Sequence, residues 1–461
     1  MFTPESIKIS IQEGNTSNFV EFIEESIKKH SSTKLCPTDE KCDFLHALPQ
    51  ILDIFIEITR IYCQEAENIG SRTVLQACLK FLKVSCAHGK SLQGMIAGKE
   101  GVLEAIKIIL NSPEDGILKK WTWHLLVNVI VGNSDTLRLI WSDFGDFLLT
   151  EMTGNHENTP ITAAVLYNCL RLAMEENVQE IPTAEIFRRM IGTLERNVGA
   201  AESNQMDFVH LSFEYVLSKV DKFRDIYSQL NGFDRTWTIF YITDHVKDSR
   251  QPQIEEEVLK YLPGQFNKKS QCILNSSLQY EEDDPKEVMA LLRCFVAITG
   301  SDTYGKVFKD NASLFINTSA LLVAVHQLSS QENSQFKPLG KLEDFSTKSQ
   351  AAQEAEKEVF FELKTLLVRL IANLSHKNRK NQDLARELNV VLTICSCTTM
   401  DARNPMMKEW AIVALKNLLE GNLENQNIIK SMVNTGPAAN NVLSELTMEN
   451  GTVRINRNQE Q

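Results

Sequence analysis

Repetition of one helix ending is the feature of this sequence that most constrains its fold. From Val359 to Val433, apolar residues recur three and four positions apart, which is the spacing of a helix that buries one broad face. Long helices are expected up to Leu374 and from Met406 to Leu419, with a short helix from Gln382 to Leu388 between them. Their endings carry matching asparagines, which are Asn373, Asn378 and Asn381 in the first and Asn417, Asn422 and Asn425 in the second. One such helix cannot bury its apolar face alone, so the segment predicts a helical repeat.

Each asparagine series begins inside an apolar helix and passes a residue expected to be left-handed where the helix stops. It ends near the start of the next helix, where a short amide side chain satisfies backbone groups. The same ending occurs far upstream, because Trp121 to Asn133 and Trp410 to Asn422 both place a Trp seven residues before an inner asparagine and then a Gly-Asn break. Self-similarity in paired helices of roughly forty residues predicts an all-α, armadillo or HEAT-type helical-repeat solenoid.

The expected domain boundary is a polar segment, residues 329–353, which is rich in Ser, Gln, Lys and Glu and contains Pro338 and Gly340. A helix from Ala438 to Leu446 is expected to close the last layer of repeats. The expected parts are N-terminal armadillo-like repeats over 1–328 with a cap over 1–70, a linker or loop that is disordered over 329–353, C-terminal repeats over 354–447, and a disordered tail over 448–461.

The charge balance argues against nucleic acid as a partner. The chain has 48 Lys and Arg against 60 Asp and Glu, a net charge of -12, and no long basic cluster. Cysteines such as Cys78 and Cys169 lie inside apolar helical runs and are interpreted as core residues in a reducing compartment. The N-terminus has no secretory signal pattern, and no apolar run approaches membrane-spanning length, so a cytoplasmic location is expected.

Motifs for chemistry are few. The run from Gly94 to Gly101 is similar to a phosphate-binding loop, but its first two glycines are too close and Glu100 stands where Ser or Thr is needed. Cys395 and Cys397 lack the second ligand pair that a structural zinc needs, so helix packing is favoured. His124 is interpreted as a packed or surface residue rather than a general base. No enzymatic activity, cofactor or metal is therefore predicted.

The candidate binding residues are the repeated Trp and Asn side chains. In armadillo-like proteins an inner asparagine can face the concave groove and hydrogen-bond an extended peptide, and a Trp two helical turns earlier completes such a clamp. The alternative is that the asparagines join adjacent repeats, since a buried amide is usually satisfied internally. The candidates are Trp121, Asn128, Asn373, Trp410 and Asn417.

The C-terminal repeats resemble the C-terminal domain of the ataxin-10 family over about Val359 to Val433, including the run NPMMKEWAI from Asn404 to Ile412. This resemblance implies an armadillo-like protein without known catalytic activity, linked to neuronal survival, neurite growth and cytokinesis. It implies protein partners, among them O-linked N-acetylglucosamine (O-GlcNAc) transferase and G-protein beta subunits, and self-association into a homo-oligomer. It also implies a cytoplasmic, perinuclear location, with the midbody or centrosome during division.

The sequence therefore predicts a non-catalytic scaffold whose helical repeats bind other proteins. Two alternatives stay open, which are an all-helical enzyme with no visible motif and an importin-like adaptor that binds peptides in the solenoid groove. An importin-like adaptor would carry the Trp and Asn pair in several successive repeats, whereas here the pair occurs in two widely separated units.

Overall fold

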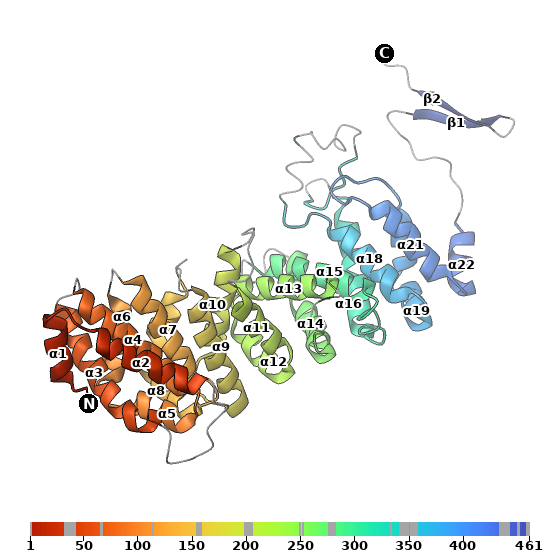
Figure 1. Cartoon of the computed structure of the whole chain (residues 1–461). Helices are drawn as coiled ribbons and strands as arrows, with labels where there is room; N and C mark the ends of the chain where they lie inside the picture. The colour runs from red at the N-terminus through yellow and green to blue at the C-terminus, as the bar shows by residue number, and fades with distance from the viewer. Residues whose placement is uncertain are drawn as a thin grey trace. The chain divides into compact units, whose positions relative to one another are not determined.

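The computed structural model describes residues 2–457 apart from 32–42, 65–67, 113–114, 154–158, 198–205, 249, 251–252, 275–282, 332–333, 341–349, 351–357, 433–442 and 450–451. The described residues are helical almost throughout (Figure 1). They form two compact units: unit 1 is Met1–Gln265 with Tyr280–Leu291, and unit 2 is Phe266–Gln279 with Leu292–Gln461. The predicted all-α, helical-repeat fold is confirmed.

Unit 1 is a stack of helices in which every second or third helix packs on its counterpart in the next layer. Helix α4 packs against α7, α7 against α9, and α9 against α11. Its helices are α1 (Pro4–Gln12), α2 (Ser17–Ser31), α3 (Asp43–Gln64), α4 (Ile69–Cys86), α5 (Lys90–Gly98), α6 (Val102–Asn111), α7 (Gly116–Ile130), α8 (Ser134–Glu151), α9 (Thr159–Glu176), α10 (Thr183–Arg196), α11 (Asp207–Leu217), α12 (Val220–Gln229) and α13 (Gly232–Lys247).

Unit 2 repeats this packing, because α16 packs against α18 and α18 against α21. Its helices are α16 (Ala312–Leu328), α18 (Leu363–Ser375), α19 (Arg379–Glu387), α20 (Val390–Ser396), α21 (Met407–Leu419) and α22 (Leu423–Lys430). Residues of α14 (Glu256–Lys269) and α15 (Asp284–Gly300) belong partly to each unit, and the short 3-10 helix η2 (Ser270–Ile273) belongs to unit 2. The apolar stripe predicted up to Leu374 is buried, since Leu367, Leu370 and Ile371 are each 0% exposed.

Among the residues that the structure describes, one type of asparagine-capped turn occurs three times. Asparagines at the starts of α8, α19 and α22 accept a hydrogen bond from a backbone N–H in the first turn of the helix, and each follows a left-handed residue. The left-handed residues are Gly132 (φ +68°), Lys377 (φ +49°) and Gly421 (φ +68°), and the capping asparagines are Asn133, Asn378 and Asn422. The predicted left-handed stop and asparagine cap are confirmed in all three turns.

Side-chain amides also satisfy the carbonyls that the end of α21 leaves free. The last four carbonyls of a helix have no partner within it. In α21 two of them accept backbone N–H groups from Glu420 (3.0 Å) and Asn422 (3.1 Å). The other two accept side-chain amides, with Gln382 donating to the Asn417 carbonyl (2.9 Å) and Asn425 to the Leu418 carbonyl (2.9 Å). Because Gln382 belongs to α19, its hydrogen bond to the end of α21 joins one repeat to the next.

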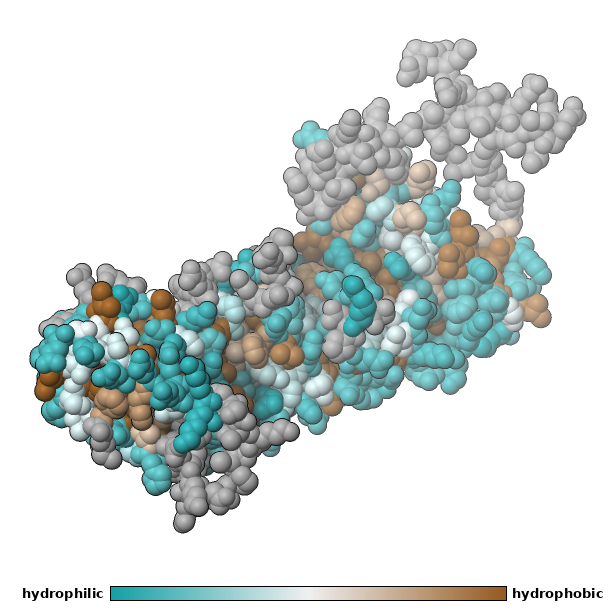
Figure 2. Space-filling model, viewed as in Figure 1, coloured by the Kyte–Doolittle hydropathy of each residue, from teal (hydrophilic) through white to brown (hydrophobic). Residues whose placement is uncertain are grey.

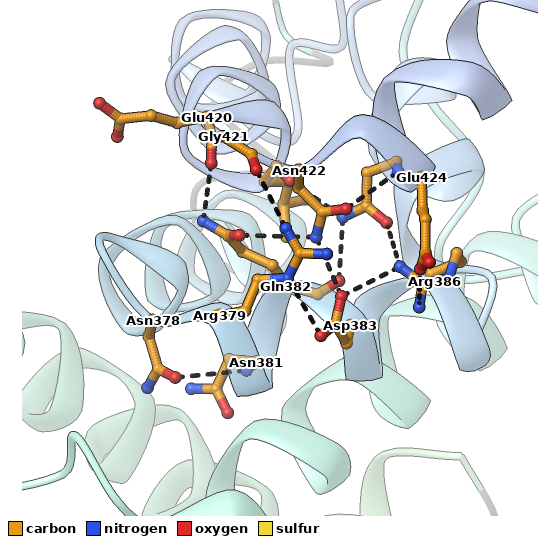
Figure 3. A network of polar contacts seen from close by, with 12 residues as sticks. Asn378, Arg379, Asn381, Gln382, Asp383, Arg386, Glu420, Gly421, Asn422 and Glu424 are labelled. Atoms are coloured by element: carbon orange, nitrogen blue, oxygen red, sulfur yellow. Dashed lines mark hydrogen bonds and ion pairs between the residues drawn. The ribbon is translucent and has the colours of Figure 1, made fainter.

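Figure 3 shows how the turn before α22 is tied to α19. The Asn422 side chain donates to the Asp383 carboxylate (3.0 Å), and Arg379 donates to the Gly421 carbonyl (3.0 Å). Asn422 is 0% exposed, whereas the Arg379 bond lies at the surface, so the tie runs from the interior to the edge of the repeat. A glutamine side chain satisfies helix-end carbonyls in unit 1 as Gln382 does in unit 2, because Gln93 donates to the carbonyls of Asn128 (2.8 Å) and Val131 (3.1 Å).

The structure differs from the sequence-based expectations in two places. The described part of the polar segment 329–353 packs on unit 2, since Phe336 is 5% exposed and the Leu339 N–H donates to Asp401 (3.1 Å). The described part of this segment thus belongs to unit 2, and its residues 332–333, 341–349 and 351–353 lie outside the described residues.

The end of the chain forms strands where a helix and a tail were expected. Strand β1 (Leu443–Glu449) pairs with β2 (Thr452–Arg457) in an antiparallel hairpin, so the helix predicted from Ala438 to Leu446 is wrong over its described part. The sequence between the strands is Asn450-Gly451, a pair typical of two-residue hairpin connections. The run from Gly94 to Gly101 begins inside α5 and ends in the turn of residues 99–101 that leads into α6, so no strand precedes it.

The repeated turn predicts opposite effects for two substitutions at its left-handed residue. Gly421→Ala should lower the free energy of unfolding by about 1 kcal/mol, because a Cβ meets no atom within 4 Å there and only the positive φ is unfavourable. Lys377→Gly should raise it by up to about 1 kcal/mol by removing the same strain. Urea unfolding followed by circular dichroism measures both. Destabilisation by Lys377→Gly would mean that the lysine side chain contributes contacts that outweigh the strain.

Candidate protein-binding site

A Trp under a cationic side chain is present in both units. On α7, Trp121 has the Lys80 ammonium of α4 at 5.5 Å and the Lys83 ammonium at 5.3 Å from its ring centre. On α21, the Trp410 ring has the Arg369 guanidinium of α18 at 4.5 Å. Lys80 and Arg369 are separated along the chain by the same interval as Trp121 and Trp410, so the two pairs are equivalent positions of one repeat. Such pairs stabilise each other through the negative face of the ring.

The structure places the predicted asparagines in different environments. Asn417 is 8% exposed and donates to the Ala372 carbonyl of α18 (2.9 Å), one of the last four carbonyls of that helix. Asn373 donates to the Thr299 hydroxyl (3.0 Å) within unit 2. Asn128 is half-buried and donates to the His124 carbonyl (2.7 Å) of its own helix. Asn373 and Asn417 therefore join neighbouring elements, whereas Asn128 does not link α7 to α4.

A hollow of about 650 Å³ lies beside Trp121 in unit 1. Its lining comes from α4, from the start of α7 and from the residue before α7, and includes Arg72, Lys83, Asp115, Lys120, Trp121 and His124. Of these, only Trp121 was a sequence-based candidate. Lys120, Trp121 and His124 have the three- and four-residue spacing of one helix face, a signal the sequence contains. Arg72 and Lys83 come from another helix, and only the packing of α4 on α7 brings them there.

The described side chains that line the hollow carry a net positive charge. Its carboxylate, Asp115, is 3% exposed, caps α7 by accepting from the Leu118 N–H (3.1 Å), and pairs with Arg72 at 2.5 Å. Burial lowers the pKa of His124, and the positive charges of Lys83 and Lys120 lower it further. The Asp115 charge is thus already matched by Arg72, and the described lining residues include no other carboxylate for the lysines.

Most of the described cysteines are packed in the core. Burial raises the pKa of the Cys169 thiol to about 12 and that of Cys397 to about 11, and both side chains are buried. Among the residues that the structure describes, no group of three His, Cys, Asp or Glu side chains is placed to hold a metal ion. Within the same residues, no helix combines the length and the apolarity that crossing a membrane requires.

Comparison with known proteins identifies the family. A family model described as the spinocerebellar ataxia type 10 protein domain matches residues 363–457. Ataxin-10 of Xenopus tropicalis is 21% identical over 389 residues, which cover 81% of this chain and 77% of that protein. Ataxin-10 of Bos taurus is 23% identical over 429 residues, 87% of this chain and 86% of that protein. The chain belongs to the ataxin-10 family.

The family model covers the C-terminal repeats. The ataxin-10 homolog of Dictyostelium discoideum is 44% identical over 94 residues, which cover 19% of this chain and only 15% of that protein. The matched domain begins at the first residue of α18 and includes α21 and the turn before α22. Trp410 and Asn417 lie inside this domain, whereas Trp121 and its hollow lie outside it.

The two equivalent asparagines predict different losses of stability. Asn417→Ala should destabilise unit 2 by about 1–3 kcal/mol, because it leaves the buried Ala372 carbonyl without a partner. Asn128→Ala should change unit 1 by less than about 0.5 kcal/mol, because its bond lies within one helix and Ala has the higher helix propensity. Hydrogen exchange read by mass spectrometry on peptides of α18 and α7 measures each unit separately. Equal effects at both positions would contradict the assignment of Asn417 as a link between repeats.

Proposed function

We propose that this ataxin-10 family protein is a non-catalytic scaffold that binds other proteins on its helical repeats. The observation that carries the proposal is the Trp121 hollow, where an aromatic ring and several charged side chains meet at the surface of unit 1. Rigid helices hold these groups from both sides, and interfaces are enriched in Trp for its large contact area. The family match names no catalytic activity, which agrees with a scaffold.

The cellular roles in this proposal follow from family membership. They are neuronal survival, neurite growth and regulation of cytokinesis, with the protein in the cytoplasm, near the nucleus, and at the midbody or centrosome during division. The proposed partners are O-GlcNAc transferase and G-protein beta subunits. An importin-like groove is less well supported than a scaffold, because Asn373 and Asn417 are engaged within unit 2 rather than free to bind a peptide.

The scaffold proposal predicts that Trp121→Ala removes protein partners. Affinity purification of the full chain from cells, followed by quantitative mass spectrometry, should show loss of a defined set of partners relative to the unmodified protein. Leu139→Ala on α8, where the side chain is 46% exposed, is the matched control and should retain that set. Circular dichroism checks that both variants remain folded. Recovery of the same partners with folded Trp121→Ala would exclude the hollow as a binding site.

We also propose self-association through α21, where apolar side chains are exposed. Ile412 is 55% and Val413 40% exposed, and Figure 2 shows apolar residues at the surface in the region of α21. At the position equivalent to Ile412, Trp123 of α7 is 1% exposed and stacks on Phe147 at 5.9 Å. Ile412→Asp should therefore shift sedimentation in the ultracentrifuge toward the monomer. A monomer at every concentration before any substitution would contradict this proposal.

A further inference from the structure

The two copies of the Trp repeat have diverged in charge, and this divergence indicates what the Trp121 hollow binds. Both copies keep the Trp and the cation above it. At the positions of Lys83, Lys120 and His124, however, the second copy has Ala372, Glu409 and Val413. Since α18 packs on α21 without these groups, as α4 packs on α7 with them, the repeat does not need the two lysines for its own packing.

The lysines of the first copy are available to a ligand. Lys80, Lys83 and Lys120 form no ion pair with a carboxylate among the residues that the structure describes, and Asp115 is already paired with Arg72. Lys120 is exposed, and Lys80 and Lys83 are half-buried beside the Trp121 ring. In a chain with a net charge of -12, this local excess of positive charge is unlike the protein as a whole. A negatively charged ligand would neutralise it.

The size of the hollow fits a short stretch of polypeptide. The α7 side of the lining extends from Asp115 to His124, a rise of about 14 Å at 1.5 Å per residue. An extended chain covers about 3.3 Å per residue, so roughly four residues fit along this length. Ile117, which is 62% exposed, and the Trp121 ring add apolar surface to the lysines.

We infer that the Trp121 hollow binds an acidic peptide segment of a partner protein. Carboxylate side chains of the segment pair with Lys83 and Lys120, and an apolar side chain beside them packs on Trp121. This inference rests on the proposed scaffold function and specifies the chemistry of its ligand. Nucleic acid fits the site less well, because phosphate-backbone binding draws on a wide basic surface and this excess is confined to a few lysines.

Panning a display library of short random peptides on the full chain tests the inference. The selected peptides should be enriched in Asp and Glu next to apolar residues. Their affinity, measured by fluorescence anisotropy, should fall as salt is raised. Lys83→Ala combined with Lys120→Glu, which introduces the residues of the second copy, should weaken binding by about tenfold or more. Lys83→Arg with Lys120→Arg should retain it, because the charge is kept.

A matched control separates local from general electrostatics. Lys8→Ala with Lys28→Glu makes the same change of charge at exposed positions elsewhere in unit 1, and should leave peptide affinity within about twofold. Binding of the acidic peptide should also raise the pKa of His124, seen as a shift of its imidazole resonances on titration. This readout reports occupancy of the hollow itself.

Three outcomes would overturn the inference. The library could yield neutral or basic peptides or none, or the control pair could weaken binding as much as the Lys83 and Lys120 pair. In the third, a short fluorescent RNA binds more tightly than the peptides and loses its binding with Lys83→Ala and Lys120→Glu. The scaffold proposal is judged separately by the partners lost with Trp121→Ala. Loss of those partners without acidic selectivity would leave the scaffold standing and refute only the ligand class.

Discussion

Satisfaction of helix-end carbonyls by asparagine and glutamine amides is the interaction on which the repeats depend. A buried carbonyl without a partner costs about 1–3 kcal/mol, and each helix ends with four that have no partner within it. At the end of α18, backbone N–H groups of His376 and Asn378 satisfy two, and the amides of Asn381 and Asn417 satisfy the others. Since Asn417 belongs to α21, the end of one repeat is completed only when the next repeat docks.

This dependence explains why the turn is retained in distant parts of the chain while the surface around it differs. Gln93 and Gln382 occupy equivalent positions and bond to equivalent carbonyls, with an asparagine cap beside each. The Trp–cation pair belongs to the same retained frame. Side chains that form none of these amide hydrogen bonds differ between the copies, with Lys83 and Lys120 in one and Ala372 and Glu409 in the other.

The sequence predicted the repeat and the asparagine turns because both rest on local spacing. It located Trp121 for the same reason, since a Trp and an Asn two turns apart are visible on one helix. It did not reveal the hollow, because Arg72 and Lys83 come from α4 and meet α7 only after packing. The hairpin at the end of the chain was not predicted because the apolar spacing before Asn450-Gly451 also fits a helix. The packing of Phe336 was not predicted because it is a single apolar residue in a polar run.

The inner asparagine forms different hydrogen bonds in the two copies of the Trp repeat. Asn417 reaches across to the Ala372 carbonyl, so α21 and α18 are bridged near their C-terminal ends, and Arg369 lies at 4.5 Å from the Trp410 ring. Asn128 bonds within α7, and Lys80 and Lys83 remain at 5.5 and 5.3 Å from the Trp121 ring. The first copy thus has its Trp beside lysines that form no ion pair with the described carboxylates, whereas in the second copy the inner asparagine links two repeats. One helical frame thereby carries a surface hollow beside Trp121 in unit 1 and a buried link between repeats at Asn417 in unit 2.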